Sequence, residues 1–494
     1  MSSIDLVVVL VYLAATISIG LWLARSHTTA GEYFLGARNL PTWAILLSIV
    51  STETSALTVI SVPGIGARGD LTFLQLAFGY LVGRFLVAAW LLPGYFRGDQ
   101  DTAYQRIENR FGRRTRQVAS SVFLITRALG DSVRVFATAI PMAVVSGWSI
   151  PASILAIGVI SLMYTWVGGF KAVVWTDVMQ LSVYLAGGVA ALWIAWTLAG
   201  GPVASLALAA DAGKLRLFDF SINFSATYTF LGGLVGGSLL SAASHGTDHL
   251  IVQRLLASSS LSAARKALVG SGIMVIAQFL LFLLIGVAIW SANLAPADQP
   301  ADQLFSRFIV QHLPTGLAGL MIAGILAAAM STISSSINSM ASSTTHDLYA
   351  GLTGRSDPHH LLRVGKLFSA TWGVLLIIGA FFFYAYTARN DSPVVVLALS
   401  IASVTYGGLL GTYILAGTSP GVQGRDVIGA LIVTVGVMLM VVFAGPIGAA
   451  TGSALLATLG KLAWPWYVPI GTLLTIIVGT LLSKLPHRHA APTG

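Results

Sequence analysis

Long apolar stretches alternate with short polar ones from one end of the chain to the other. A membrane-spanning helix needs roughly 20 consecutive, mostly apolar residues. The stretches that meet or nearly meet this requirement are 4–24, 41–66, 72–96, 116–146, 151–168, 174–199, 227–256, 267–291, 315–347, 364–387, 393–416, 427–449 and 464–483. The pattern therefore predicts an all-α integral membrane protein with about 13 transmembrane helices.

The composition agrees with this interpretation. Hydrophobic residues make up 56% of the chain and charged residues 9%, whereas soluble domains carry about 25% charged residues. The mean hydropathy is +0.83. The chain has no cysteine, which excludes disulfides, thiolate metal sites and a thiol nucleophile.

The basic residues predict an orientation. Lys and Arg gather in alternate loops, most densely in the loop 97–116, and such loops stay in the cytoplasm. We therefore expect the N-terminus outside, the C-terminus in the cytoplasm and a location in the inner membrane. The net charge of +9 then reflects topology and not a nucleic-acid partner. The loop 97–116 either rests on anionic lipid or serves only as a topology signal, and no protein partner is evident.

One predicted span carries an unusual number of hydroxyl groups. Within 326–349, helical spacing places six small or hydroxylated residues on one face: Ala328, Ser331, Thr332, Ser335, Ser339 and Ser342. Such a face suits a small hard cation, which prefers oxygen ligands. It equally suits close helix packing, with each hydroxyl bonded to its own backbone.

Two other predicted spans look interrupted. The stretch 49–66 carries Glu53, several hydroxyls and Pro63, and the stretch 232–248 is rich in glycine and ends on His245 and Asp248. Broken helices in matching places of two halves indicate a transporter site. The two stretches are five helices apart, as expected of two inverted five-helix repeats. The alternative is a pair of glycine-rich helices that merely kink.

Four motifs carry a resemblance to a known family: 51–58 with 62–64, 167–180, 246–254, and 327–338 closing with 345–349. The chain resembles the sodium/solute symporter family over nearly its whole length. The resemblance implies a LeuT-type 5+5 inverted repeat and Na⁺-driven secondary active transport by alternating access. It also implies one domain over 1–494, with a peripheral helix in 1–35, a core in 36–424 and peripheral helices in 425–494.

The resemblance further implies ion sites. The family's common Na⁺ site corresponds to backbone carbonyls of two residues in the broken second span, to one carbonyl of the ninth span and to two of its hydroxyls. The matching residues are Ser51, Thr54, Ala328, Ser331 and Thr332. A second Na⁺ site, present in some members, matches Asp177, Ser331, Ser334 and Ser335. Asp177 is alternatively a helix N-terminal acid stabilised by the helix dipole.

By alignment with family members, Ser55, Thr58 and Gln75 correspond to substrate-facing positions. Glu53 and Asp248 lie at the two interruptions, and we count both among the substrate-binding candidates. Glu53 stands where the proline branch has Asp and the galactose branch Asn. Asp248 replaces an Asn and Leu250 an aromatic gate residue of the galactose branch. These departures argue against a sugar held by amide hydrogen bonds and aromatic stacking.

The predicted fourth span carries Arg127, Asp131 and Arg134 on one face, at spacings of four and three residues. They form either a neutral structural network, with Glu53 or Asp248 taking the second arginine, or an anion site at Arg134. Glu53 could instead face substrate or shuttle a proton, and His245 could carry one.

We therefore expect a Na⁺-coupled importer of a small polar solute, with a preference for an organic anion such as a carboxylate. The alternatives are a H⁺-coupled or Na⁺-independent transporter, or a membrane sensor that transports nothing. An enzyme is disfavoured, because neither a nucleophile–base pair nor a metal-ligand cluster is evident in the sequence.

Overall fold

The computed structural model describes residues 2–23, 29–98, 100–387 and 394–485. Within these residues the secondary structure is helical, and the β-structure is limited to one isolated bridge between Leu40 and Ser258. The first helices are α1 (Ser3–Leu23), α2 (Ala30–Leu35), η2 (Gly36–Arg38), α3 (Thr42–Glu53), α4 (Ala56–Arg68), α5 (Leu74–Leu86), η3 (Val87–Leu91), α6 (Leu92–Tyr95), α7 (Gln105–Phe111), α8 (Arg113–Ser146) and α9 (Ile150–Leu198). The middle of the chain forms α10 (Pro202–Asp211), η4 (Gly232–Gly237), α11 (Ser238–Gly246), α12 (His249–Leu256), α13 (Leu261–Ser291), α14 (Ala301–His312), α15 (Leu317–Ser343), η5 (Thr344–Tyr349) and α16 (Ala350–Thr353). The last part forms α17 (Pro358–Thr387), α18 (Val394–Thr418), α19 (Gly424–Val442), α20 (Ala444–Thr451), α21 (Ala454–Leu459), η6 (Trp464–Trp466) and α22 (Tyr467–Lys484).

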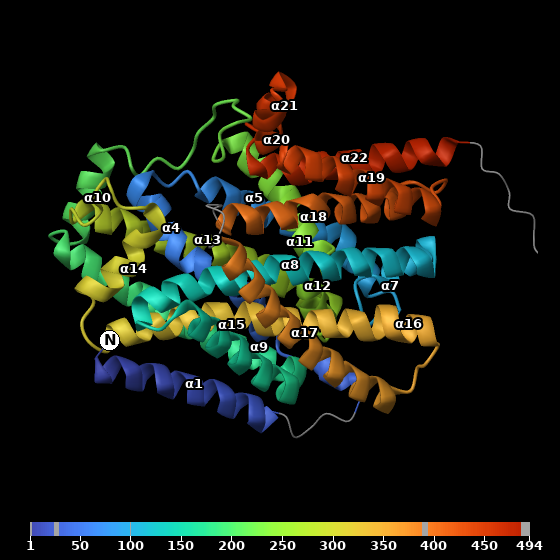
Figure 1. Ribbon diagram of the computed structural model, residues 1–494, viewed down its shortest axis with the longest axis horizontal. Coiled ribbons are helices and arrows are strands. Elements are labelled where there is room, and N and C mark those ends of the chain that lie inside the picture. The colour runs from blue at the N-terminus through green and yellow to red at the C-terminus, as the bar shows by residue number, and fades with distance from the viewer. Residues whose placement is uncertain (1, 24–28, 99, 388–393, 486–494) are drawn as a thin grey trace, which may run out of the picture.

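The long helices lie side by side in one bundle (Figure 1). Helix α1 runs along one edge of the view, and α19 and α22 run along the opposite edge. Helices α4, α10 and α14 gather at one end of the bundle, and α7 and α16 at the other. Helix α15 is central: it packs most extensively on α9 and also touches α1, α8 and α17. The hydroxyl-rich face of α15 is therefore buried in protein and does not face lipid.

Eight helices of the described residues are long and apolar enough to cross a membrane, or nine if one bent pair counts as a span. The expected spans 116–146, 227–256 and 393–416 correspond to α8, to the run η4–α11–α12 and to α18, which that count does not include. The expected spans 151–168 and 174–199 both lie within α9, which is kinked at Gly169 (φ 59°, ψ −159°). Residue 24 of the first expected span and residue 393 of the eleventh lie outside the described residues.

Both expected interruptions are real breaks. Helices α3 and α4 meet at an angle of 67°, with Thr54 and Ser55 extended between them. The Ser55 hydroxyl caps α4 by accepting a hydrogen bond from the Thr58 N–H, as serine favours at a helix start. At the second break, the Asp248 side chain caps α12 through the Leu250 N–H. Short polar side chains thus replace the backbone partners that each break removes.

Helix α4 of the broken α3–α4 pair is pressed against α13. A Cβ atom built on Gly286 of α13 would lie 1.8 Å from the Pro63 carbonyl oxygen, and one on Gly66 of α4 would lie 2.3 Å from the Leu283 carbonyl oxygen. Small residues let membrane helices approach until their backbones touch. This contact sets the position of α4, and with it the position of the break.

We predict that Gly286→Val lowers the midpoint of thermal unfolding of the purified protein, because the valine side chain must displace the α4 backbone. Overpacking of this kind costs about 1–3 kcal/mol or more. Gly436→Val on α19 is the matched control, since a Cβ there meets nothing within 4 Å. Equal unfolding midpoints for the two variants would contradict this account of the α4–α13 contact.

Candidate ion and substrate site

The break between α3 and α4 lies against the hydroxyl-rich face of α15. The Ser51 hydroxyl donates to the Ser331 Oγ at 2.9 Å, and both residues are fully buried. On α15, the Thr332 hydroxyl donates to the Ala328 carbonyl oxygen at 3.2 Å. The structure thus brings Ser51 and Ser331 into direct contact, and Ala328 and Thr332 lie within one helical turn of that contact.

The backbone at this point has carbonyl oxygens to offer. The Thr54 N–H bonds the Val50 carbonyl, which ends the α3 ladder. Carbonyls beyond Val50 therefore lack the helical partner that they would have in an unbroken span. The Thr54 hydroxyl is already engaged: it donates to the Val50 carbonyl oxygen at 2.8 Å and accepts from Gln278 Nε2 at 2.7 Å. Thr54 therefore has its carbonyl, and not its hydroxyl, available for a ligand.

The donor set around this contact consists of neutral oxygens from serine and threonine hydroxyls and from peptide carbonyls. Hard cations such as Na⁺ prefer oxygen ligands of this kind. Ser51, Thr54, Ala328, Ser331 and Thr332 therefore offer oxygens whose chemistry fits a small monovalent cation.

Asp177 lies directly beside this set and is fully buried. Its Oδ1 accepts from the Ser331 hydroxyl at 2.7 Å, and its Oδ2 accepts from the Ser48 hydroxyl at 2.6 Å. Its Oδ2 also lies 2.9 Å from Arg254 Nη2. Asp177 is therefore the counter-ion of a buried arginine, although the sequence offered Asp177 only as an ion ligand or a helix N-terminal acid.

The four residues expected at a second ion site are only partly assembled. Asp177 and Ser331 are in contact, and Arg254 donates to the Ser335 hydroxyl. The Ser334 hydroxyl instead donates to the Ser331 carbonyl of its own helix at 3.1 Å. Arg254, the last residue of the motif 246–254, was not among our candidates. An arginine in an apolar helix was the signal that could have identified it.

A cavity of about 360 Å³ opens beside the break, and Thr332 reaches its wall. Of the expected substrate-binding residues, Glu53, Ser55, Thr58 and Arg134 line it. Aromatic side chains supply much of the remaining wall: Phe73, Tyr80, Tyr228, Phe279, Tyr406 and Trp464. Small-molecule sites have this composition, with an apolar wall and a few placed polar groups.

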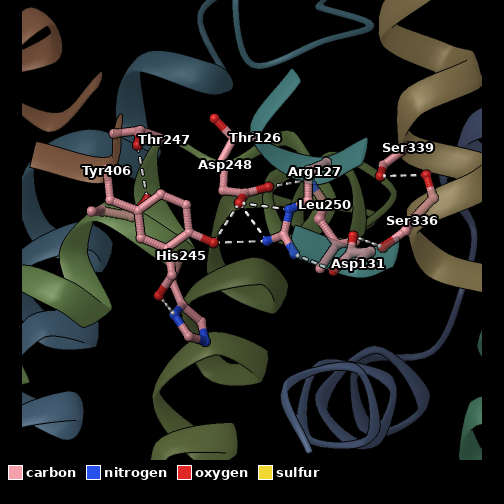
Figure 2. Close-up of polar contacts among 12 residues, drawn as sticks. Thr126, Arg127, Asp131, His245, Thr247, Asp248, Leu250, Ser336, Ser339 and Tyr406 are labelled. Carbon is pink, nitrogen blue, oxygen red and sulfur yellow. Dashed lines mark hydrogen bonds and ion pairs between the residues drawn. The ribbon is translucent and has the colours of Figure 1, made fainter. Parts of the chain in front are cut away.

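The charged face of α8 forms a network with the second break (Figure 2). Arg127 donates to Asp248 through Nε at 3.1 Å and lies 3.5 Å from Asp131. The Tyr406 hydroxyl accepts from Arg127 at 2.9 Å and donates to Asp248 at 2.8 Å. Asp248 is thus the partner of Arg127 and is not among the residues that line the cavity. Tyr406 gave no signal in the sequence.

Arg134 differs from Arg127 in its surroundings. Its Nη1 lies 2.9 Å from Asp131 Oδ1, and 30% of its side chain is exposed, against 8% for Arg127. Asp131 also accepts from the Ser336 hydroxyl of α15. Both arginines line the cavity, Arg127 within a buried network and Arg134 as the more exposed of the two.

Glu53 is paired with a buried arginine. Arg84 of α5 donates to its Oε2 and, through Nη1, to the Ser271 hydroxyl at 2.6 Å. His245 Nε2 lies 3.5 Å from the same Glu53 oxygen. The Glu53 side chain keeps 19% exposure, so one carboxylate both neutralises Arg84 and faces the cavity.

Gln75 does not line the cavity. Its Nε2 donates to the Thr72 and Tyr228 carbonyls, and its Oε1 accepts the Asp219 N–H at 3.0 Å. Because both ends of the amide are engaged, Gln75 anchors the segment 212–230 to the start of α5.

Two basic residues of the segment 212–230 also attach it to the end of α4: Arg216 pairs with Asp70, and Lys214 bonds backbone carbonyls. Burial alone would raise the pKa of Asp70, but hydrogen bonds from Thr72 and from Arg216 outweigh it and lower that pKa. Burial lowers the pKa of Lys214, whose Nζ donates to the Ala67 and Gly69 carbonyls at 2.8 Å.

Comparison with known proteins accords with this geometry. A family model described as the sodium:solute symporter family matches residues 33–417. The human sodium/iodide cotransporter is 31% identical over 438 residues, which are 85% of this chain and 66% of that protein. The sodium/sialic acid symporter of Proteus mirabilis is 27% identical over 96% of this chain and 93% of its own. A solved substrate-bound, outward-open Na⁺-coupled sialic acid symporter, described as revealing a novel Na⁺ site, superposes with a TM-score of 0.85. It is 25% identical and covers 98% of each chain.

We predict that Arg254→Met lowers the unfolding midpoint strongly, because it leaves the Asp177 carboxylate buried without a counter-ion. Removing one partner of a buried pair costs about 3–5 kcal/mol. Arg216→Met, which removes the partner of Asp70 at a site where the arginine is 58% exposed, should cost about 0–1 kcal/mol. Adding Asp177→Asn to Arg254→Met should restore part of the lost unfolding midpoint, because it removes the unpaired buried charge. Equal midpoints for the two single variants would contradict a structural role for the Asp177–Arg254 pair.

Proposed function

Because the chain belongs to the sodium:solute symporter family, we propose that it imports a small organic anion together with Na⁺. Membership makes it a multi-pass membrane transporter that uses Na⁺ and not an enzyme. The substrate, the residues that bind it and the orientation of the termini belong to the proposal.

The contact between Ser51 and Ser331 carries the ion part of the proposal. It joins the broken second span to α15 through hydroxyl oxygens 2.9 Å apart, beside carbonyls freed by the break. Na⁺ bound by Ser51, Thr54, Ala328, Ser331 and Thr332 would replace this direct hydrogen bond with coordination from both helices. The ion would then stabilise the conformations in which the two helices are close.

A second Na⁺ beside Asp177, Ser331, Ser334 and Ser335 would compete with a fixed cation. The Arg254 guanidinium already contacts Asp177 and Ser335, and two cations repel at such distances. We propose that a second Na⁺ binds only in a conformation in which Arg254 has left Ser335.

The partly exposed Arg134 supports an anionic substrate. Arg127, Arg84 and Arg254 each have a buried or half-buried carboxylate of their own. Arg134 shares Asp131 with Arg127, so the two arginines and the two carboxylates of this network balance, and Arg134 is its more exposed cation. A guanidinium is a geometrically suited partner for a carboxylate. The iodide and sialic acid named for the relatives are both anions. Glu53, Ser55 and Thr58 would contact the rest of the substrate, whereas Gln75 and Asp248 would act by holding the cavity walls.

Coupling then follows from differential affinity. If Na⁺ binds more tightly to the outward-facing state, it raises the population of the state that accepts substrate, and the substrate in turn raises Na⁺ affinity. An inward Na⁺ gradient would drive the cycle, with the N-terminus outside and the C-terminus in the cytoplasm of a cell whose inner membrane holds the protein. The 5+5 inverted repeat, with its broken helices in matching positions, would supply the moving parts.

One observation favours a second candidate. His245 lies beside Glu53 in the cavity wall, and a histidine–carboxylate pair is suited to proton transfer. This arrangement supports H⁺ coupling as the alternative to Na⁺ coupling.

We predict that purified protein in proteoliposomes accumulates a substrate anion when Na⁺ is higher outside, and that uptake falls at least tenfold when K⁺ replaces Na⁺. The measurement is uptake of radiolabelled organic acids under imposed Na⁺ or H⁺ gradients. Uptake driven equally well by a H⁺ gradient without Na⁺ would favour the alternative. A ligand that binds without net flux under either gradient would point to a sensor.

A further inference from the structure

Two residues of α11 that line the cavity each carry a buried polar atom without a hydrogen bond. Within the described part of the chain, Ser241 Oγ and His245 Nε2 have no hydrogen-bond partner, although each residue is only 2% exposed. Both residues line the cavity. Buried polar atoms are nearly always paired, and each exception calls for an explanation. A bound molecule that supplies the missing partners is such an explanation.

The surroundings of His245 define what its Nε2 offers. Nδ1 lies 2.8 Å from the Ser244 hydroxyl and 3.2 Å from the Ser241 carbonyl oxygen, so this nitrogen finds its partners within α11. The Glu53 carboxylate, 3.5 Å from Nε2, attracts a proton to that nitrogen. His245 therefore presents an N–H donor beside a carboxylate acceptor, and the gap between them is too long for a good direct hydrogen bond.

A hydroxyl group is the complement of this pair, because it accepts one hydrogen bond while it donates another. Its oxygen would accept from His245 Nε2–H, and its proton would go to Glu53 Oε2. A charged amine could donate to the carboxylate but could not accept from His245, and a methylene group could form neither hydrogen bond. The unpartnered Ser241 hydroxyl lies one helical turn from His245 and can bond a second oxygen of the same molecule.

We propose that Ser241, His245 and Glu53 form a hydroxyl-binding subsite, so that the substrate is a hydroxylated carboxylic acid. This inference rests on the proposed function for the carboxylate, which Arg134 would bind. Further wall hydroxyls at Ser55, Thr58 and Ser61 suit a molecule with several hydroxyl groups. A cavity of about 360 Å³ lies at the small end of the range of ligand sites, roughly 300–1,000 Å³.

The test uses acids matched in carbon skeleton. Lactate and propionate, gluconate and hexanoate, and quinate and cyclohexanecarboxylate are titrated into the purified full-length protein in Na⁺ buffer, with binding followed by calorimetry. At least one hydroxy acid should bind tenfold or more tightly than its partner, since a site that loses a hydrogen bond to a buried group discriminates strongly. The inference is overturned if every deoxy acid binds as well as its partner, or if no hydroxy acid binds.

Variants assign the preference to the subsite. Ser241→Ala and His245→Ala should each weaken the hydroxy acid about tenfold and leave the matched deoxy acid unchanged. His245→Gln, which keeps a side-chain N–H donor, should weaken it less than His245→Ala. Ser182→Ala is the control, because that serine is exposed on α9 and bonds only its own helix. Undiminished preference in both alanine variants would overturn the assignment.

The same titrations separate this inference from the proposed function. A hydroxy acid that binds equally in Na⁺ and in K⁺ buffer would contradict Na⁺ coupling but support the subsite. A deoxy acid whose binding depends on Na⁺ and matches that of its hydroxy partner would support Na⁺ coupling and overturn the subsite.

Discussion

The interruption of helical hydrogen bonding between α3 and α4 is the feature on which the rest of the site depends. Carbonyl groups that lose their helical partners are tolerated at membrane depth only where protein or a cavity surrounds them. Here the break lies against α15, whose residues from Met321 to Ser343 are all buried within the protein. The hydroxyls of Ser331 and Ser335 on α15 contact those of Ser51 and Thr52 at the end of α3, so the proposed cation site lies where the backbone is interrupted.

Buried charges tie the broken segments to the rest of the bundle. Glu53 joins α3 to Arg84 of α5, Asp248 joins the second break to Arg127 of α8, and Arg254 joins α12 to Asp177 of α9. A buried charge without its partner costs several kcal/mol, so these helices can change position only if the pairs survive or are exchanged. The arrangement thus favours discrete conformations over continuous deformation, as the proposed alternating access requires.

The Ser331 hydroxyl connects the two parts of the ion region. It accepts from Ser51 and donates to Asp177, so the carboxylate fixes the direction of its proton and leaves lone-pair density on the side of the α3–α4 break. Ligand orientation by a neighbouring carboxylate is common in metal sites. The Asp177 carboxylate therefore orients the Ser331 hydroxyl, a ligand of the proposed first ion site, while its own charge is balanced by Arg254.

The helices and both breaks could be predicted from the sequence, because apolar length, glycine and short polar residues act locally. The contact between Ser51 and Ser331 could be expected only through the family resemblance, since it joins residues 280 positions apart. The partners of Glu53, Asp177 and Asp248 depend on how each helix is rotated in the bundle, which hydropathy does not encode. Helix rotation also explains two errors of the sequence analysis. Gln75 was expected in the cavity, but its amide holds the segment 212–230. Tyr406, which lines the cavity, was not expected there.

Equilibrium binding of radiolabelled Na⁺ to the purified protein tests most directly whether the break and α15 form an ion site. The account predicts saturable binding that K⁺ does not displace and that the double variant Ser331→Ala, Thr332→Ala weakens at least tenfold. Saturable binding that is unchanged in this variant, or no Na⁺ binding in the unaltered protein, would contradict it.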